Sequence, residues 1–336
     1  MPRTVAVDAL FEGQVREFVS MIPAVRDGSN EAIHDARIAT RRIRAALQIV
    51  SERYEKGQIK AIKRAVGRAG RALGRARDLD VLLGLVAELE RKTSAAGTAA
   101  LPLRHRLLDE QTARRRKLLT RIDELPLGSL SDTVIQARLK DSRFHLSHVV
   151  SRPACAASFR ERLAARMGHV RHAVEEASGI YVPEKAHAAR IAIKKLRYLL
   201  EIGEAARLWN PADAVKTAQR AQGELGEAHD RHLLIDRLNQ IEGEEFLRER
   251  SLAKQLLDAE CQDHYIKYVA RRGNLLTVCD SIETFLHPHS FLKQHGSVLA
   301  ALMVPAALVA AHVSGGYLTN RSIRHTRLPD RPLARQ

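Results

Sequence analysis

The sequence has few aromatic residues and few cysteines, and each shortage argues against a class of protein. Phe, Trp and Tyr together make up 4% of the 336 residues, with a single tryptophan, Trp209. Proteins that hold single-stranded nucleic acid by stacking its bases rely on such side chains, so this mode of binding is disfavoured. The three cysteines, Cys155, Cys261 and Cys279, are never spaced as CxxC. This argues against a disulfide framework and a cysteine zinc site, and we expect a reducing, cytoplasmic setting.

Acidic residues are fewer than basic ones, so the expected partner is negatively charged. Lys and Arg number 55 against 39 Asp and Glu, which gives a formal net charge of +16 at pH 7. A field of that sign attracts nucleic acid, anionic membrane and polyphosphate alike, so charge alone does not identify the partner. Residues 1–18 lack the basic lead and apolar run that are typical of a secretion signal.

Clustered carboxylates, which hold the divalent metals used in phosphoryl transfer, are also scarce. Asp78 and Asp80 are the conspicuous acidic pair on a basic segment, and we expect them to pair with neighbouring arginines. We therefore expect no catalytic residue, no cofactor and no metal site. The enzymatic alternative, a histidine phosphocarrier or a polyphosphate hydrolase, would be revived by phosphate release that depends on His34.

What the chain does contain is a helix with two rows of side chains, between Asn30 and Val50. Apolar and small residues recur every three or four positions and predict a face buried in a core, namely Ile33, Ala36, Thr40, Ile43, Leu47 and Val50. A basic row follows the same steps one position later, about 100° around the helix, namely His34, Arg37, Arg41 and Arg44. A row that only keeps a helix soluble lies opposite the apolar face. Because this row flanks the apolar face, where neighbouring helices converge, we interpret it as an anion site.

Apolar periodicity and turn signals predict four helices in the first part of the chain. They span Val5–Val25, Asn30–Val50, Gln58–Arg91 and Leu101–Leu125, with a short connecting helix within 129–150. The third helix contains Gly67, Gly70 and Gly74. These glycines lower helix propensity and indicate that another helix packs closely against them.

The chain then repeats itself. The segment IHDARIATRRIRAAL from Ile33 matches AHAARIAIKKLRYLL from Ala186, and the matched histidines are offset by 187 − 34 = 153. Further on, LGRARDLDVLL from Leu73 matches LGEAHDRHLLI from Leu225, at an offset of 225 − 73 = 152. The duplication predicts an all-α fold of two four-helix bundles related by a pseudo-twofold axis. The two basic rows would then meet around a basic central cavity.

The repeated motifs resemble those of the CHAD family, the conserved histidine alpha-helical domain. The first copy reads His34-x-x-Arg37-x-x-x-Arg41-Arg42-x-Arg44 and then Arg77-Asp78-Leu79-Asp80-Val81. The resemblance covers Val5 to Arg272. It predicts a CHAD domain over 1–275, with repeat one at about 4–125, a linker at about 126–153 and repeat two at about 154–272.

The second copy departs from the family pattern. His229 takes the place of Arg77, and Arg231-His232 takes the place of Leu79-Asp80, so this corner of the second copy is expected to contribute differently. Some relatives carry a triphosphate tunnel (CYTH) domain marked by an ExExK strand, and Glu242 to Phe246 is not such a motif. The chain resembles a stand-alone form.

The resemblance implies a non-enzymatic protein that binds inorganic polyphosphate at a basic surface, often at polyphosphate granules of bacteria and archaea. The residues expected to bind the chain of phosphates are His34, Arg37, Arg41, Arg44, Lys63, Arg64, Arg68, Arg71, Arg75, His187, Arg190, Lys194, Arg197, Lys216 and Arg220. Guanidinium forks bond phosphate oxygens in pairs, and lysines supply point charge. Bound phosphates would raise the pKa of His34 and His187, so mildly acidic pH is expected to tighten binding.

Other interpretations of the same residues stay open. The basic row is also what a solvated face looks like, and the charge alone also fits a general nucleic-acid-binding module, although nucleic acid is not the specific ligand we expect. His34 and His187 lie in the first turn of their helices, where a capping or core role is the alternative. The run from Arg114 to Lys117 in the fourth helix is interpreted as a solvated face that steers polyanions.

Residues 276–336 form an extension beyond the repeat. An apolar helix is predicted at about 297–318, and the sequence leaves open whether it contacts or spans a membrane or docks as a buried helix. The apolar segment is short for a bilayer and contains Pro305 and His312. A basic tail follows from Arg321 and is expected to hold a polyanion or anionic lipid.

Overall fold

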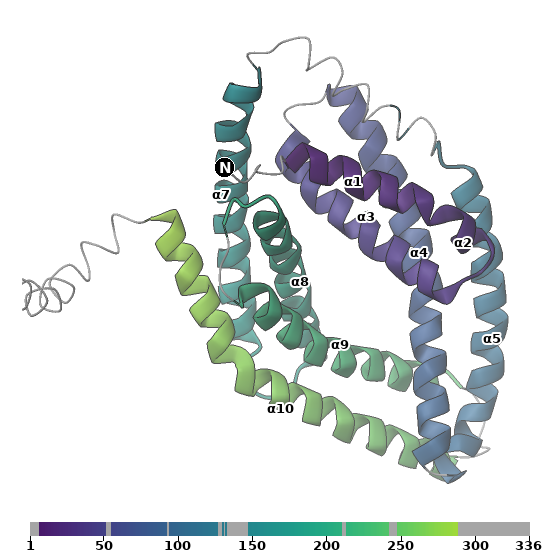
Figure 1. The fold of residues 1–336 in the computed structure, drawn as a ribbon. Coiled ribbons are helices and arrows are strands. Elements are labelled where there is room, and N and C mark those ends of the chain that lie inside the picture. Colours follow the sequence, from purple (N-terminus) through teal and green to yellow (C-terminus); the bar gives the residue numbers. More distant parts are fainter. Residues whose placement is uncertain are drawn as a thin grey trace, which may run out of the picture. The chain divides into compact units, whose positions relative to one another are not determined.

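The fold is helical throughout the part of the chain that the structure describes. The computed structural model describes residues 7–51, 55–92, 94–126, 130, 132, 147–209, 213–241 and 247–287, and these contain no strand. The helices are α1 (Val7–Ser20), α2 (Ile22–Arg26), α3 (Asn30–Val50), α4 (Lys56–Lys92), α5 (Ser94–Asp123), α7 (Ser147–Glu176), α8 (Pro183–Ala205), α9 (Ala214–Asn239) and α10 (Leu247–Leu286) (Figure 1). The all-α prediction is confirmed.

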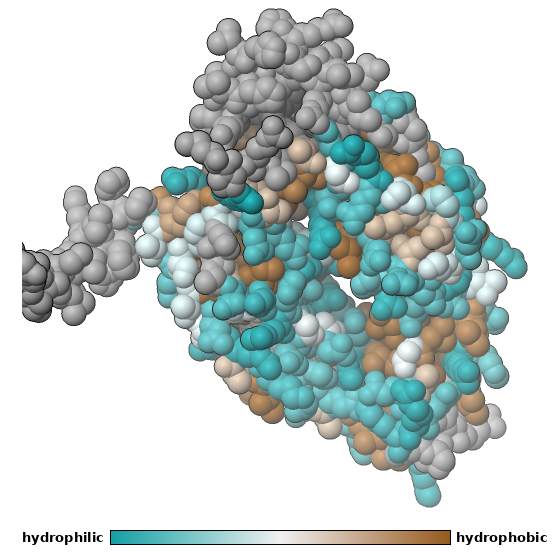
Figure 2. Space-filling view, viewed as in Figure 1, coloured by the Kyte–Doolittle hydropathy of each residue, from teal (hydrophilic) through white to brown (hydrophobic). Residues whose placement is uncertain are grey.

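The chain divides into two compact units, residues 1–282 and 283–336, and the contacts described below lie within the first. On the face shown in Figure 2, hydrophilic residues cover most of the described surface, above all over α9 and α10. The apolar segment predicted at about 297–318 lies outside the described residues. Within the described residues, no helix combines the length and the apolar character needed to cross a membrane.

Helix α3 begins and ends where the sequence predicted. Ser29 caps it, because its side-chain oxygen accepts a hydrogen bond from the backbone N–H of Ala32 at 3.2 Å, and Glu31 adds a favourable charge in the first turn. The predicted apolar face is buried, and Thr40 satisfies its hydroxyl by donating to the carbonyl of Arg37. The basic row therefore starts from a helix whose orientation is fixed by its core.

Two predicted helix boundaries were wrong. The first helix does not run unbroken from Val5 to Val25, because α1 ends at Ser20 and α2 begins at Ile22 with Pro23 in its first turn. Proline lacks the N–H that a continuing helix needs and favours a first turn. The fourth helix starts at Ser94 rather than Leu101 and continues through Pro102. The preceding segment, SAAGTAA, is rich in alanine, the strongest helix former.

Helices that correspond to each other in the repeat lie in contact. Helix α3 contacts α8, and α4 contacts α9, whereas α4 also packs on α5 and α8 on α9. This pairing of equivalent helices is what packing about an approximate twofold axis would produce, and the axis itself stays a prediction.

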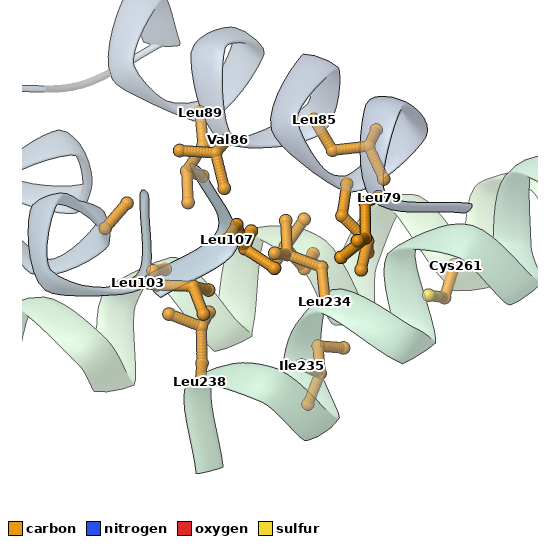
Figure 3. Packing of buried hydrophobic residues seen from close by; sticks show 14 residues of the cluster. Leu79, Leu85, Val86, Leu89, Leu103, Leu107, Leu234, Ile235, Leu238 and Cys261 are labelled. Atoms are coloured by element: carbon orange, nitrogen blue, oxygen red, sulfur yellow. The ribbon is translucent and has the colours of Figure 1, made fainter. Parts of the chain in front are cut away.

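A cluster of buried apolar residues joins the two copies at one end of α4 and α9 (Figure 3). It contains the equivalent residues Leu82 and Leu234 and also Val86 and Leu238, at the repeat offset of 152, together with residues of α5 and α10. Arg231, one of the departures from the family pattern, is buried beside this cluster. Its guanidinium donates to Glu227 and Glu260, each at 2.6 Å. Its charge is therefore neutralised within the fold.

Among the glycines of the described residues, Gly203 of α8 leaves the least room for a side chain, which provides a test of the fold. A Cβ at this position would lie 2.6 Å from Cζ of Phe159, whose side chain is itself buried. Overpacking costs about 1–3 kcal/mol, so we expect Gly203→Ala to lower the free energy of unfolding in urea. The matched control is Gly84→Ala, because Gly84 is helical and a Cβ there would meet nothing within 4 Å. That change should stabilise the chain by about 0.5–1 kcal/mol. A Gly203→Ala protein as stable as the wild type would show that Phe159 is not held in place.

Candidate anion-binding site

The basic rows of α3 and α8 meet at the contact between these two helices. Arg41 of α3 donates from Nη1 to the hydroxyl of Tyr198 of α8 at 3.3 Å. Around this contact lies a pocket of about 230 Å³, which we name the α3–α8 pocket. Its cationic lining comes from α3, α7 and α8, namely Arg41, Arg44, Arg166, Lys194 and Lys195. Three of the predicted residues, Arg41, Arg44 and Lys194, are therefore brought together.

Arg37 and Arg190, one turn before Arg41 and Lys194, are equivalent residues that face equivalent glycines. Arg37 donates from Nη2 to Oδ1 of Asp78 at 2.8 Å. Gly74 on α4 and its equivalent Gly226 on α9 let the guanidinium groups approach closely. A Cβ on either glycine would lie 3.6 Å from Nε of the arginine it faces.

The predicted pairing of Asp78 and Asp80 with arginines is confirmed. Asp78 takes Arg37, as described above, and Asp80 lies 3.5 Å from Nη2 of Arg115 and accepts a hydrogen bond from Gln111 at 2.7 Å. Both carboxylates thus serve to position α3, α4 and α5.

The basic rows of α3 and α8 lie close enough to affect each other's pKa values. Burial, followed by the charges of Arg41, Arg190 and two further cations, lowers the pKa of Lys194 to about 7. The pKa of Arg37 is also lowered, first by burial and then by Arg41. Cations from both copies thus destabilise one another's charged forms, so an anion placed among them would be bound favourably.

The two histidines of the rows differ in their neighbours. Burial lowers the pKa of His34, and Arg77 lowers it further. Nδ1 of His187 lies 3.3 Å from Nδ1 of His229, the residue that replaces Arg77 in the second copy. The pKa of His187 is lowered by burial and by Arg190, and burial lowers the pKa of His229 to about 4. The second copy therefore has a neutral ring at neutral pH where the first has an arginine.

The predicted residue Arg197 does not line the α3–α8 pocket. It donates to Glu201 at 2.5 Å and to Gln222 at 2.9 Å, and its side chain is only 13% exposed. At the repeat offsets, Gln48 and Gly70 stand in place of Glu201 and Gln222. The equivalent Arg44 therefore lacks both partners and reaches the pocket.

The cations predicted on α4 and α9 lie elsewhere. Lys63, Arg64 and Arg71 line a pocket of about 500 Å³ near the start of α4, and Arg68, Arg71 and Arg75 line another between α4 and α5. On α9, Lys216 lies 3.3 Å from Asp213, and Arg220 is exposed. A single cavity that joins all the predicted residues stays a prediction.

Sequence reasoning missed Lys195 and Arg166 as lining residues of the α3–α8 pocket. Lys195 was visible in the repeat, where it aligns with Arg42. Arg166 lies on α7, outside both repeated motifs, and it donates to Gln48 of α3 at 3.4 Å. Only the packing of α7 against α3 and α8 reveals it.

The fold and the site thus define a helical protein. Cations from two equivalent helices gather around one of its pockets. The chain belongs to the CHAD domain family, whose model matches residues 9–239. Its fold is similar to the crystal structure of the CHAD domain from the plant Ricinus communis, with a TM-score of 0.50, 19% identity, and coverage of 84% of this chain and 92% of that one. It is also similar to PptA from Streptomyces chartreusis, with a TM-score of 0.52, 16% identity, and coverage of 83% and 99%. None of the curated proteins compared with the chain matches it.

Replacing Lys194 with methionine tests whether the gathered cations repel one another in the free protein. The pKa of Lys194 is about 7 in the folded chain and returns to about 10.4 on unfolding. Between these values the unfolded chain holds a proton that the folded chain has lost, so the free energy of unfolding rises with pH, and below about pH 7 the charged lysine destabilises the fold. We expect Lys194→Met to stabilise the chain at about pH 6, with a gain that shrinks toward about pH 10.

Urea unfolding at several pH values measures this effect. The control is Lys60→Met, which removes an exposed lysine of α4 that does not act on Lys194 and should change the free energy of unfolding by no more than about 0.5 kcal/mol. A gain from Lys194→Met that is the same at every pH would contradict the electrostatic origin.

Proposed function

We propose that the protein binds inorganic polyphosphate, without catalysing its conversion, through the α3–α8 pocket. The observation that carries the proposal is the convergence of Arg41 and Arg44 from one copy with Lys194 and Lys195 from the other around one pocket. The CHAD family is associated with polyphosphate binding in general, which supports the same ligand. In the cell, the expected place of action is the cytoplasm, at polyphosphate granules.

The chemistry of the pocket suits consecutive phosphoryl groups. Arginine presents a planar fork that bonds two phosphate oxygens at once, and lysine adds a mobile point charge. The row from His34 to Arg44 extends about 15 Å along α3, at 1.5 Å per residue, so a chain of phosphates can follow it. Tyr198 is the one aromatic residue lining the pocket, and its hydroxyl already accepts from Arg41. The pocket therefore has few aromatic side chains on which a nucleic-acid base could stack.

Binding of a polyanion is expected to take up protons. The lowered pKa values of Lys194, His34 and His187 arise in part from neighbouring cations. Bound phosphates would oppose those charges and raise the pKa values again. A fall in pH through about 7 therefore favours the charged, binding-competent Lys194, in agreement with the tighter binding expected at mildly acidic pH.

The combined variant Arg41→Gln, Arg44→Gln, Lys194→Gln tests the proposal. Each lost charge-assisted hydrogen bond is worth about 1.5–3 kcal/mol, so we expect long-chain polyphosphate to bind at least about a hundredfold more weakly. The matched control is Arg16→Gln, Arg91→Gln, Arg248→Gln, which removes the same charge from exposed positions outside the pockets described above. It should change the affinity by less than about threefold, because only screened long-range attraction is lost.

Competition by double-stranded DNA with an equal number of phosphates completes this experiment at fixed salt. We expect DNA to compete poorly with polyphosphate on the wild-type chain. Equal competition would favour a general nucleic-acid-binding module, and unchanged polyphosphate affinity of the pocket variant would refute the proposed site.

A further inference from the structure

A second strongly basic pocket lies between α4 and α5, apart from the α3–α8 pocket. It has a volume of about 680 Å³, and we name it the α4–α5 pocket. The principal cations lining it are Arg68, Arg71 and Arg75 of α4 with Arg114, Lys117 and Arg121 of α5. None of these six residues lines the α3–α8 pocket.

The six cations form two matching rows. On α4 they stand at positions i, i+3 and i+7, and on α5 they stand at the same spacing, which places each set on one face of its helix. Each row extends about 10 Å along its helix, at 1.5 Å per residue. Part of the run from Arg114 to Lys117, expected to be a plain solvated face, therefore belongs to a concave surface that it shares with α4.

Carboxylates neutralise little of this charge. Within the described part of the chain, Arg68, Arg71, Arg75 and Lys117 take part in no ion pair, whereas Arg121 pairs with Glu124 at 2.8 Å in an exposed position. Arg114 lies 3.4 Å from Glu110, which also accepts from Arg237 of α9 at 3.1 Å. Like charges held on neighbouring faces repel one another, so an anion bound between the two rows would be stabilising.

At the corresponding place in the second copy, carboxylates stand among the cations. At the repeat offset of 152, Ala72 and Arg75 correspond to Glu224 and Glu227 of α9. Glu224 lies 2.9 Å from His264 and 2.7 Å from Arg271, both on α10, the counterpart of α5 in element order. In the second copy the charges at this place are thus neutralised by internal ion pairs, whereas in the described part of the first copy most of the cations stay unpaired.

We propose that the α4–α5 pocket is a second, independent anion site, which holds a short run of consecutive phosphoryl groups. The rows lack aromatic side chains for a base, and their length suits a few linked phosphates better than the spaced phosphates of a nucleic acid. The proposal deepens the function proposed above and rests on it for the class of ligand. The phosphoryl groups come either from a free small polyphosphate or from a segment of a long chain.

The experiment uses the full chain with the α3–α8 pocket disabled by Arg41→Gln, Arg44→Gln and Lys194→Gln. Isothermal titration with tripolyphosphate, in a buffer free of phosphate at about 0.1 M salt, should still detect one site. Adding Arg71→Gln, Arg75→Gln and Lys117→Gln should weaken this binding by about tenfold or more. Adding the control changes Arg16→Gln, Arg91→Gln and Arg248→Gln instead should alter it by less than about threefold.

Further readouts keep the proposal falsifiable. The first readout is the stability of the variant altered only at Arg71, Arg75 and Lys117. Because three unpaired like charges are removed, this variant should unfold in urea no more easily than the wild type. Its stability therefore separates loss of a ligand site from loss of the fold. Titration of long-chain polyphosphate onto the disabled background distinguishes the two sources of phosphoryl groups. Tighter binding of the long chain per site assigns a chain segment, and equal binding assigns a free small anion.

The proposal is overturned if tripolyphosphate does not bind to the disabled background, or binds equally well after the α4–α5 changes. It is also overturned if single-stranded DNA with the same number of phosphates displaces tripolyphosphate equally well. The proposed function has a separate test. It fails if the wild-type chain shows no preference for long-chain polyphosphate over double-stranded DNA. The α4–α5 site would still stand in that case if the α4–α5 changes weaken tripolyphosphate binding.

Discussion

The structure depends on holding two like-charged helix rows against each other where α3 meets α8. Burial and the neighbouring cations together lower the pKa of Lys194 to about 7. The opposing stabilisation lies at the far end of α4 and α9, where an apolar cluster joins the copies (Figure 3). Ion pairs flank that cluster, including Lys92 with Glu260 at 2.5 Å and Arg237 with Glu110 at 3.1 Å. The apolar end holds the two copies together, and the basic end is the site proposed for an anion.

The two copies have diverged in which of their cations stay open. Arg197 is bound to Glu201 and Gln222, while its counterpart Arg44 lines the α3–α8 pocket. His229 supplies a neutral ring where Arg77 stands in the first copy. At the α3–α8 pocket the row of each copy supplies two cations, Arg41 and Arg44 from the first and Lys194 and Lys195 from the second.

The sequence was sufficient to predict α3 and the meeting of its basic row with that of α8, but not the break between α1 and α2, the start of α5 or the state of each cation. The bounds of α3, the repeat and the ion pair of Asp78 follow from periodicity and motif order. Which arginine is free depends on partners that a neighbouring helix supplies, as Gln222 of α9 does for Arg197. Arg166 reaches the pocket from α7, which carries neither repeated motif. Helical periodicity gives the face of a side chain, whereas its partners are set by packing between helices.

In the proposed complex, cations from both copies hold the same anion. The most direct measurement is a crystal structure of the full chain with bound tripolyphosphate. We expect phosphoryl oxygens in the α3–α8 pocket within hydrogen-bonding distance of Arg41 from the first copy and Lys194 from the second, at about 2.7–2.9 Å. A structure in which the bound anion contacts cations of one copy alone, and leaves the α3–α8 pocket empty, would contradict the account.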